Sequence, residues 1–242
     1  MRGLAQQRGA QGRCRGLVAG LAVGTVVVTS GCAAEGMAGE AEDTTSTSPE
    51  ASSSVHPVTT VVVTDDPAYS AAGSSADGTW PALLAANLAD EGGPLELTSA
   101  AAQGAGFAPD DPSEPSFTDL VVERVEPSTQ LVVFFETAFG SADARAVGDG
   151  AAAAFKSVEE AAPDAVMVVV GPYRASPDAP EPTDEVRGAL RDATQGAEAP
   201  ATYVDPVDER WPVGAGQQQI ADLLTGPLAP LAKSLAESGA FE

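Results

Sequence analysis

Acidic side chains follow the apolar segments of this sequence at the points where those segments end. Asp65 and Asp66 follow one such segment, Glu136 follows a second, and Asp208 comes shortly after a third. Carboxylates that converge raise one another's pKa or attract a cation, and paired carboxylates hydrolyse glycosides by acid and base catalysis. In so acidic a chain, such carboxylates are also typical of solvated loops. A functional cluster and ordinary loop acids are therefore both open interpretations.

Other catalytic groups are scarce. The chain has one histidine, His56, and two cysteines, Cys14 and Cys32, all near the N-terminus. A serine nucleophile needs an adjacent base, so a serine-histidine pair is not expected. A serine-lysine pair with Lys156 or Lys233 is disfavoured because both lysines lie on expected helix surfaces. Too few histidines and cysteines remain for a zinc site, and we expect no metal or other cofactor.

Five short apolar runs predict the strands that would position these groups. Valine-rich runs of this kind predict a sheet buried on both faces, and their alternation with helical patterns predicts parallel strands. We expect a flavodoxin-like three-layer α/β sandwich with strand order 2-1-3-4-5. Ligands of such sheets bind beyond the carboxyl ends of the strands. The expected strands are Val58–Thr64, Leu95–Ala100, Gln130–Phe135, Ala165–Gly171 and Ala201–Val204.

Helical periodicity predicts the covering layers. The C-terminal stretch Gln217–Leu235 is expected as two pieces because Pro227 and Pro230 interrupt it. The other expected helices are Trp80–Ala89, Val147–Ala162 and Asp184–Thr194.

The N-terminal residues predict export and a lipid anchor. Arginines precede the apolar run Leu17–Val28, which is short for a membrane span, and Ser30-Gly31-Cys32 resembles a lipoprotein lipobox. Cys32 would then carry the lipid, including acyl chains such as palmitate. Residues 1–31 form the signal peptide, 32–57 a disordered tether and 58–242 the folded domain. The alternative is an ordinary cleaved signal peptide.

The formal net charge of −23 excludes some partners. It repels nucleic acids and favours solubility. Arg145, Arg187, Arg191 and Arg210 are scattered along the chain, so we expect no basic patch. Abundant alanine and glycine with scarce lysine are typical of an actinobacterial protein. We expect a monomeric extracellular domain on the outer face of the cell membrane, with an acyl or glycan group as its ligand.

Seven short pieces of the folded region together resemble the small actinobacterial SGNH (GDSL-type) hydrolases, which are serine esterases and lipases. The likeness extends over about residues 58–230, and no single piece is specific. The pieces are VVVTDD (61–66), WPALL (80–84), QGAGFA (103–108), LVVFF (131–135), AAPDA (161–165), VVVGP (168–172) and YVDP (203–206).

The resemblance implies a Gly-Asp-Ser nucleophile, an oxyanion glycine, a Gly-x-Asn-Asp asparagine and an Asp-x-x-His base. Here Pro67, or Ala68 after a gap shift, stands at the nucleophile position, and Ala138 replaces the asparagine. Trp211 stands at the histidine position. The alternative is that Trp211 belongs to the preceding loop and that the whole Asp-x-x-His unit is deleted. The family's glycine falls on Gly104 or on Gln103, and Asp208 is the remaining acid of the Asp-x-x-His unit.

These departures predict a pseudoenzyme that acts as a binding or envelope-interaction module. A negative charge at Glu136 would also oppose an oxyanion. The first alternative is an active ester or glycan hydrolase with relocated carboxylates, and the second is a protein that keeps the fold for stability alone. The candidate cleft residues are Asp65, Asp66, Gln103, Glu136, Arg174 and Asp208.

Overall fold

The computed structural model describes residues 55–65, 78–137 and 143–239. Their central element is a five-stranded, fully parallel sheet in the order β2-β1-β3-β4-β5, which confirms the predicted strand order. The strands are β1 (Val58–Thr64), β2 (Leu95–Ala101), β3 (Leu131–Phe135), β4 (Val166–Val170) and β5 (Ala201–Val204).

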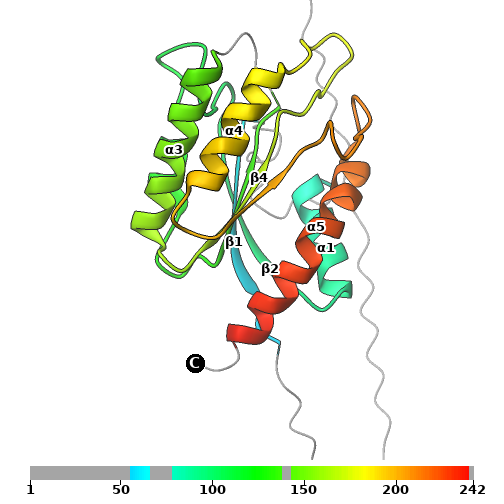
Figure 1. Ribbon diagram of the computed structural model, residues 1–242. Helices are drawn as coiled ribbons and strands as arrows, with labels where there is room; N and C mark the ends of the chain where they lie inside the picture. Colours follow the sequence, from blue (N-terminus) through cyan, green and yellow to red (C-terminus); the bar gives the residue numbers. More distant parts are fainter. Residues whose placement is uncertain (1–54, 66–77, 138–142, 240–242) are drawn as a thin grey trace, which may run out of the picture. The chain divides into compact units, whose positions relative to one another are not determined.

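Helices cover both faces of the sheet. On one face α1 (Trp80–Asp90) packs beside α5 (Gln217–Ser238), and on the other α3 (Ala144–Ala161) packs beside α4 (Asp184–Gly196) (Figure 1). A shorter helix, α2 (Phe117–Arg124), joins the α3 side. Each layer buries its own apolar core against the sheet. The valine runs are therefore explained by burial on both faces.

The helix α2 was not expected from periodicity, although the sequence carries a start signal for it. Ser116 and Asp119 form a capping box: the Asp119 N–H donates to Ser116 Oγ at 3.2 Å, and the Ser116 N–H donates to Asp119 Oδ2 at 2.8 Å. Such a pair satisfies two backbone donors at a helix start.

The expectation that the C-terminal helix breaks into two pieces is wrong. α5 is a single helix with Pro227 and Pro230 inside it. Each proline removes a backbone hydrogen bond, but the helix buries a continuous apolar stripe against α1 and the sheet, which includes Leu224 and Leu228. That packing outweighs the lost bonds. None of the helices within the described ranges has both the length and the apolar character of a membrane span.

Candidate functional site

The carboxyl ends of the strands bring three acids to one level. The register pairs Thr64 with Phe135 and Val170 with Val204, so Asp65, Glu136 and Asp205 all come one residue after a strand. All three are buried, with 5%, 3% and 6% of their surface exposed. Buried acids of this kind require hydrogen-bond partners, and each of the three has them.

Asp65 ties the end of β1 to the end of β3. Its carboxylate accepts a hydrogen bond from the Thr137 backbone N–H at 2.9 Å and another from Thr137 Oγ1 at 2.7 Å. The side chain therefore fixes the residue at which the chain leaves β3.

Glu136 lies deeper, against the segment that follows β2. Its Oε2 accepts a hydrogen bond from the Phe107 N–H at 3.3 Å, and a Cβ at Gly106 would overlap its Oε1. Burial raises the pKa of Glu136 well above its ordinary value; the Phe107 N–H opposes this rise, and the nearby charges of Asp65 and Asp110 add to it. The carboxyl is thus held in a place that favours its neutral form.

Replacing Glu136 by glutamine should remove a pH dependence of stability. The unfolded state loses this proton near pH 4.3, whereas the folded state keeps it to higher pH. The free energy of unfolding therefore falls as pH rises through that window. At pH 7 we therefore expect Glu136→Gln to be more stable than the original protein, an advantage that vanishes near pH 4.

Urea unfolding between pH 4 and pH 8 measures this difference. The control is Glu123→Gln on the surface of α2, where 61% of the side chain is exposed; its stability should run parallel to that of the original protein. Parallel curves for Glu136→Gln as well would show that burial does not hold the proton.

The segment after β2 carries the predicted oxyanion glycine. Gly104 has φ +76°, and a Cβ there would overlap the Glu114 carboxylate. Because only glycine adopts this conformation readily, Gly104 shapes the turn that leads to Phe107. Gln103 is exposed.

Asp208 takes part in an ion-pair network with α4. Arg187 Nη2 contacts Asp208 Oδ1 at 2.7 Å and Asp205 Oδ2 at 2.9 Å, and Arg191 Nη2 contacts the same two acids at 3.2 and 2.7 Å. Burial opposes ionisation of Asp205, but the Arg187 hydrogen bond and the Val207 N–H outweigh it and lower its pKa. The network fastens the chain after β5 onto α4.

Loss of the buried acid should cost far more stability than loss of the exposed one. We expect Asp205→Asn to lower the free energy of unfolding by about 3 kcal/mol, because the largely buried Arg187 would lose its buried partner and keep only exposed acids, Asp184 and Asp208. Asp208 has 63% of its side chain exposed, and Asp208→Asn should cost less than about 1 kcal/mol. Urea unfolding at pH 7 compares the two, and equal losses would contradict this division of roles.

The same network predicts a loss of stability in acid. The pKa of Asp205 is lowered in the folded state, so its contribution is present above the unfolded pKa near 3.9. It disappears as the pH falls through the lower folded value.

Trp211, at the expected histidine position, is a packing residue with 9% of its surface exposed. Its ring meets the Tyr173 ring edge-on at 5.9 Å, and the Tyr173 hydroxyl donates to the Pro212 carbonyl at 3.3 Å. Arg174 donates to the carbonyls of Ala179 and Pro177 at 2.9 and 2.5 Å. Its guanidinium therefore braces its own loop.

A small cavity lies beyond the ends of β4 and β5. Its volume is about 190 Å³, and it has mainly apolar walls with one acid and one arginine at its edge. The lining residues are Pro172, Tyr173, Arg174, Glu181, Pro182, Pro206, Val207, Trp211 and Val213.

His56 lies at the other end of the sheet. It precedes β1, whose seven residues rise by about 3.3 Å each, which puts His56 more than about 20 Å from the carboxyl edge along the strand. Lys156 and Lys233 are exposed on α3 and α5, as expected from the sequence. Three predicted site residues, Asp66, Pro67 and Ala138, lie outside the described residues, as does Cys32.

Arg187 and Arg191 are site residues that the sequence reasoning missed. They stand four residues apart and so share one face of α4, which was the available signal. Their partners follow β5, at a distance along the chain that no helical pattern predicts.

The comparisons with known proteins agree with this architecture. No model of a known protein family matches the chain. The GDSL lipase Rv0518 of Mycobacterium tuberculosis is 27% identical over 170 residues, covering 63% of this chain and 71% of the lipase.

Two solved structures share the fold. A mutant acetyl esterase with acetate ion has a TM-score of 0.54 at 14% identity, covering 74% of this chain and 99% of that one. A carbohydrate esterase family 2 enzyme with a carbohydrate-binding domain, from Corynascus thermopiles (Myceliophthora fergusii), has a TM-score of 0.52 at 16% identity, covering 73% and 67%. The chain therefore carries a domain with the fold of the SGNH/GDSL-type hydrolases.

Proposed function

We propose that this protein is a lipid-anchored binding module of the cell envelope whose SGNH hydrolase-like domain does not perform serine-esterase catalysis. The observation that carries the proposal is the position of His56. It is the one imidazole of the sequence, and it lies at the end of β1 opposite the edge where the fold binds ligands. A serine there would have no histidine to accept its proton.

A hydrolase based on relocated carboxylates has less support. Glu136 is 3% exposed, so a substrate does not reach its carboxyl. Asp208 is paired with two arginines, so its carboxylate oxygens are already engaged within the protein. These are the arrangements of structural acids.

The ligand we propose is an acyl or glycan group bound in the cavity beside Trp211. At about 190 Å³ the cavity is smaller than the pockets that hold drug-sized molecules, which suits one small group of a larger ligand. Tyr173 and Trp211 offer aromatic surface. The fold neighbours described as an acetyl esterase and a carbohydrate esterase favour an acylated carbohydrate.

Ligand-dependent melting tests this proposal. Acetylated xylo-oligosaccharides should raise the melting temperature of the purified protein, because a ligand that binds only the native state stabilises it. Val207→Arg, at a half-exposed wall of the cavity, should abolish the shift. The matched control Val122→Arg changes an exposed valine of α2 outside the cavity and should preserve it.

Unacetylated oligosaccharides and butyrate separate the glycan and acyl contributions to binding. If none of these probes changes the melting temperature, the binding role is wrong for this ligand class. The interpretation in which the fold is kept for stability alone then takes its place.

A further inference from the structure

The Glu136 side chain occupies a space built around it. Its carboxyl rests on the Cα of Gly106, where any Cβ would overlap Oε1, and it accepts the Phe107 N–H at 3.3 Å. Only 3% of the residue is exposed. The space therefore combines burial, a backbone donor and a missing side chain, which together match the size and polarity of a carboxyl group.

Rigid packing keeps the backbone donor of this space in position. The Phe107 ring lies 4.8 Å from the Phe117 ring and 5.5 Å from the Phe134 ring. Gly150 on α3 admits the Phe107 carbonyl, since a Cβ there would overlap that oxygen. The ring and the carbonyl of Phe107 are thus held by α2, α3 and β3, independently of Glu136. The space should therefore persist when the glutamate is shortened.

We propose that this space is a binding site for a small carboxylic acid, which the chain fills with its own Glu136 side chain. Beyond Cβ a glutamate ends in one methylene and a carboxyl group, so Glu136→Ala would leave a vacancy of the size and shape of acetic acid. In the unaltered protein the site is closed to external ligands. The inference does not depend on the proposed binding function, which concerns the cavity beside Trp211.

The electrostatics of the site indicate which form of the acid it accepts. Burial raises the pKa of Glu136, and the charge of Asp65 adds to this rise. An external acid in the same place should therefore bind better in its neutral form, and binding should weaken as the pH rises.

Acetate rescue of Glu136→Ala tests the proposal. The melting temperature of the purified variant is compared in sodium acetate and in sodium chloride of equal ionic strength, at pH 5 and pH 8. At pH 5 acetate should raise it by about 3–6 °C once its concentration exceeds the dissociation constant tenfold. The shift should shrink at pH 8, and the unaltered protein should show none.

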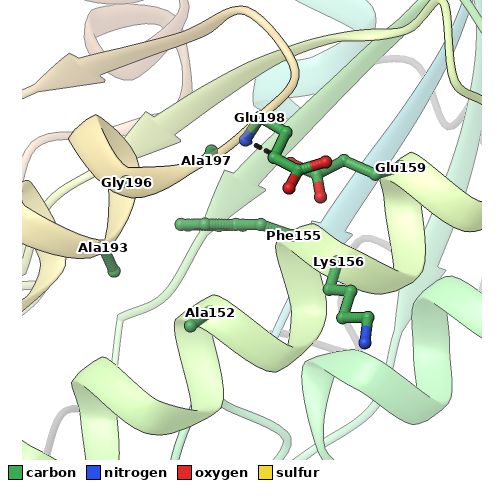
Figure 2. Close-up of a pocket in the computed structure, with 8 residues that line it drawn as sticks. All are labelled: Ala152, Phe155, Lys156, Glu159, Ala193, Gly196, Ala197 and Glu198. Carbon is green, nitrogen blue, oxygen red and sulfur yellow. Dashed lines mark hydrogen bonds between the residues drawn. The ribbon is translucent and has the colours of Figure 1, made fainter.

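Glu159→Ala is the matched control. Glu159 also uses a carboxylate to accept backbone N–H groups, from Glu198 at 2.7 Å and from Ala199 at 3.0 Å. It does so at a surface hollow of about 300 Å³ between α3 and α4, open to solvent beside Lys156 (Figure 2). Acetate should raise the melting temperature of this variant no more than that of the unaltered protein, because water can fill the place of the lost carboxylate.

A double variant locates the bound acid. Glu136→Ala/Gly106→Ala adds the Cβ that would overlap the carboxyl, and it should lose the acetate effect. Equal shifts in all variants, or no shift in Glu136→Ala, would overturn the proposal. If Glu136→Ala does not fold in chloride, its refolding from urea is compared in the two salts. Recovery in acetate alone supports the site, and recovery in neither overturns it.

Discussion

The purified protein is expected to hydrolyse p-nitrophenyl acetate and butyrate no faster than an inert protein of similar surface. Serine-esterase catalysis needs a nucleophile, oxyanion donors and a base. By the family resemblance, Pro67, Ala138 and Trp211 stand where the serine, asparagine and histidine belong. Loss of one oxyanion donor costs roughly a hundred- to a thousandfold in rate, and loss of the triad costs about a millionfold.

Restoring one group should not restore turnover. Pro67→Ser supplies a hydroxyl, but His56 lies at the far end of β1 and triad groups act as a unit. Trp211→His would place an imidazole near Asp208, yet that acid is already paired with Arg187 and Arg191. A GDSL esterase of known activity serves as the positive control. Saturable turnover of the unaltered protein that Asp208→Asn or Glu136→Gln abolishes would support the carboxylate-based hydrolase instead.

The structure changes how Glu136 is expected to affect an oxyanion at this site. The sequence suggested that its negative charge would oppose an oxyanion. Burial raises its pKa, so the carboxyl stays neutral over a wider pH range, and it fills the space on Gly106. We therefore expect any interference of Glu136 with an oxyanion to come from the volume of its side chain more than from its charge. Only the contact with Gly106, in the segment after β2, reveals this.

The fold was predictable because its signals are local and repeated. Valine runs and helical periodicity place the strands and most helices, and parallel connections leave few strand orders. The prediction failed at α5, where burial of Leu224 and Leu228 outweighs two prolines. It also missed α2, whose capping box at Ser116 and Asp119 was readable.

The site was predictable only in outline. The strand ends show that Asp65, Glu136 and Asp205 come to one edge, but not which acids are buried. Asp208 remains 63% exposed while Asp205 is 6% exposed, and this difference depends on how the chain after β5 meets Arg187. The contact between Gly106 and the Glu136 carboxyl joins residues thirty positions apart. Such contacts follow from tertiary packing, which no local pattern encodes.

Replacing Cys32 by alanine should move the protein from the membrane fraction to the soluble fraction. The prediction rests on the apolar run Leu17–Val28 followed by Ser30-Gly31-Cys32, residues that lie outside the described ranges. Two acyl chains on one cysteine hold a protein firmly to a bilayer, whereas one chain binds marginally. The formal net charge of −23 offers no electrostatic substitute, because bilayers with anionic lipids repel it.

Cys14→Ala is the matched control, since it removes the other cysteine of the chain, which lies before the apolar run. It should leave the protein in the membrane fraction and leave incorporation of a palmitate analogue unchanged, whereas Cys32→Ala should abolish incorporation. An unaltered protein that is already soluble would indicate an ordinary cleaved signal peptide. If Cys32→Ala remains with the membrane and still incorporates the label, Cys32 is not the anchor, because the attachment would have survived loss of the sulfur that is proposed to carry it.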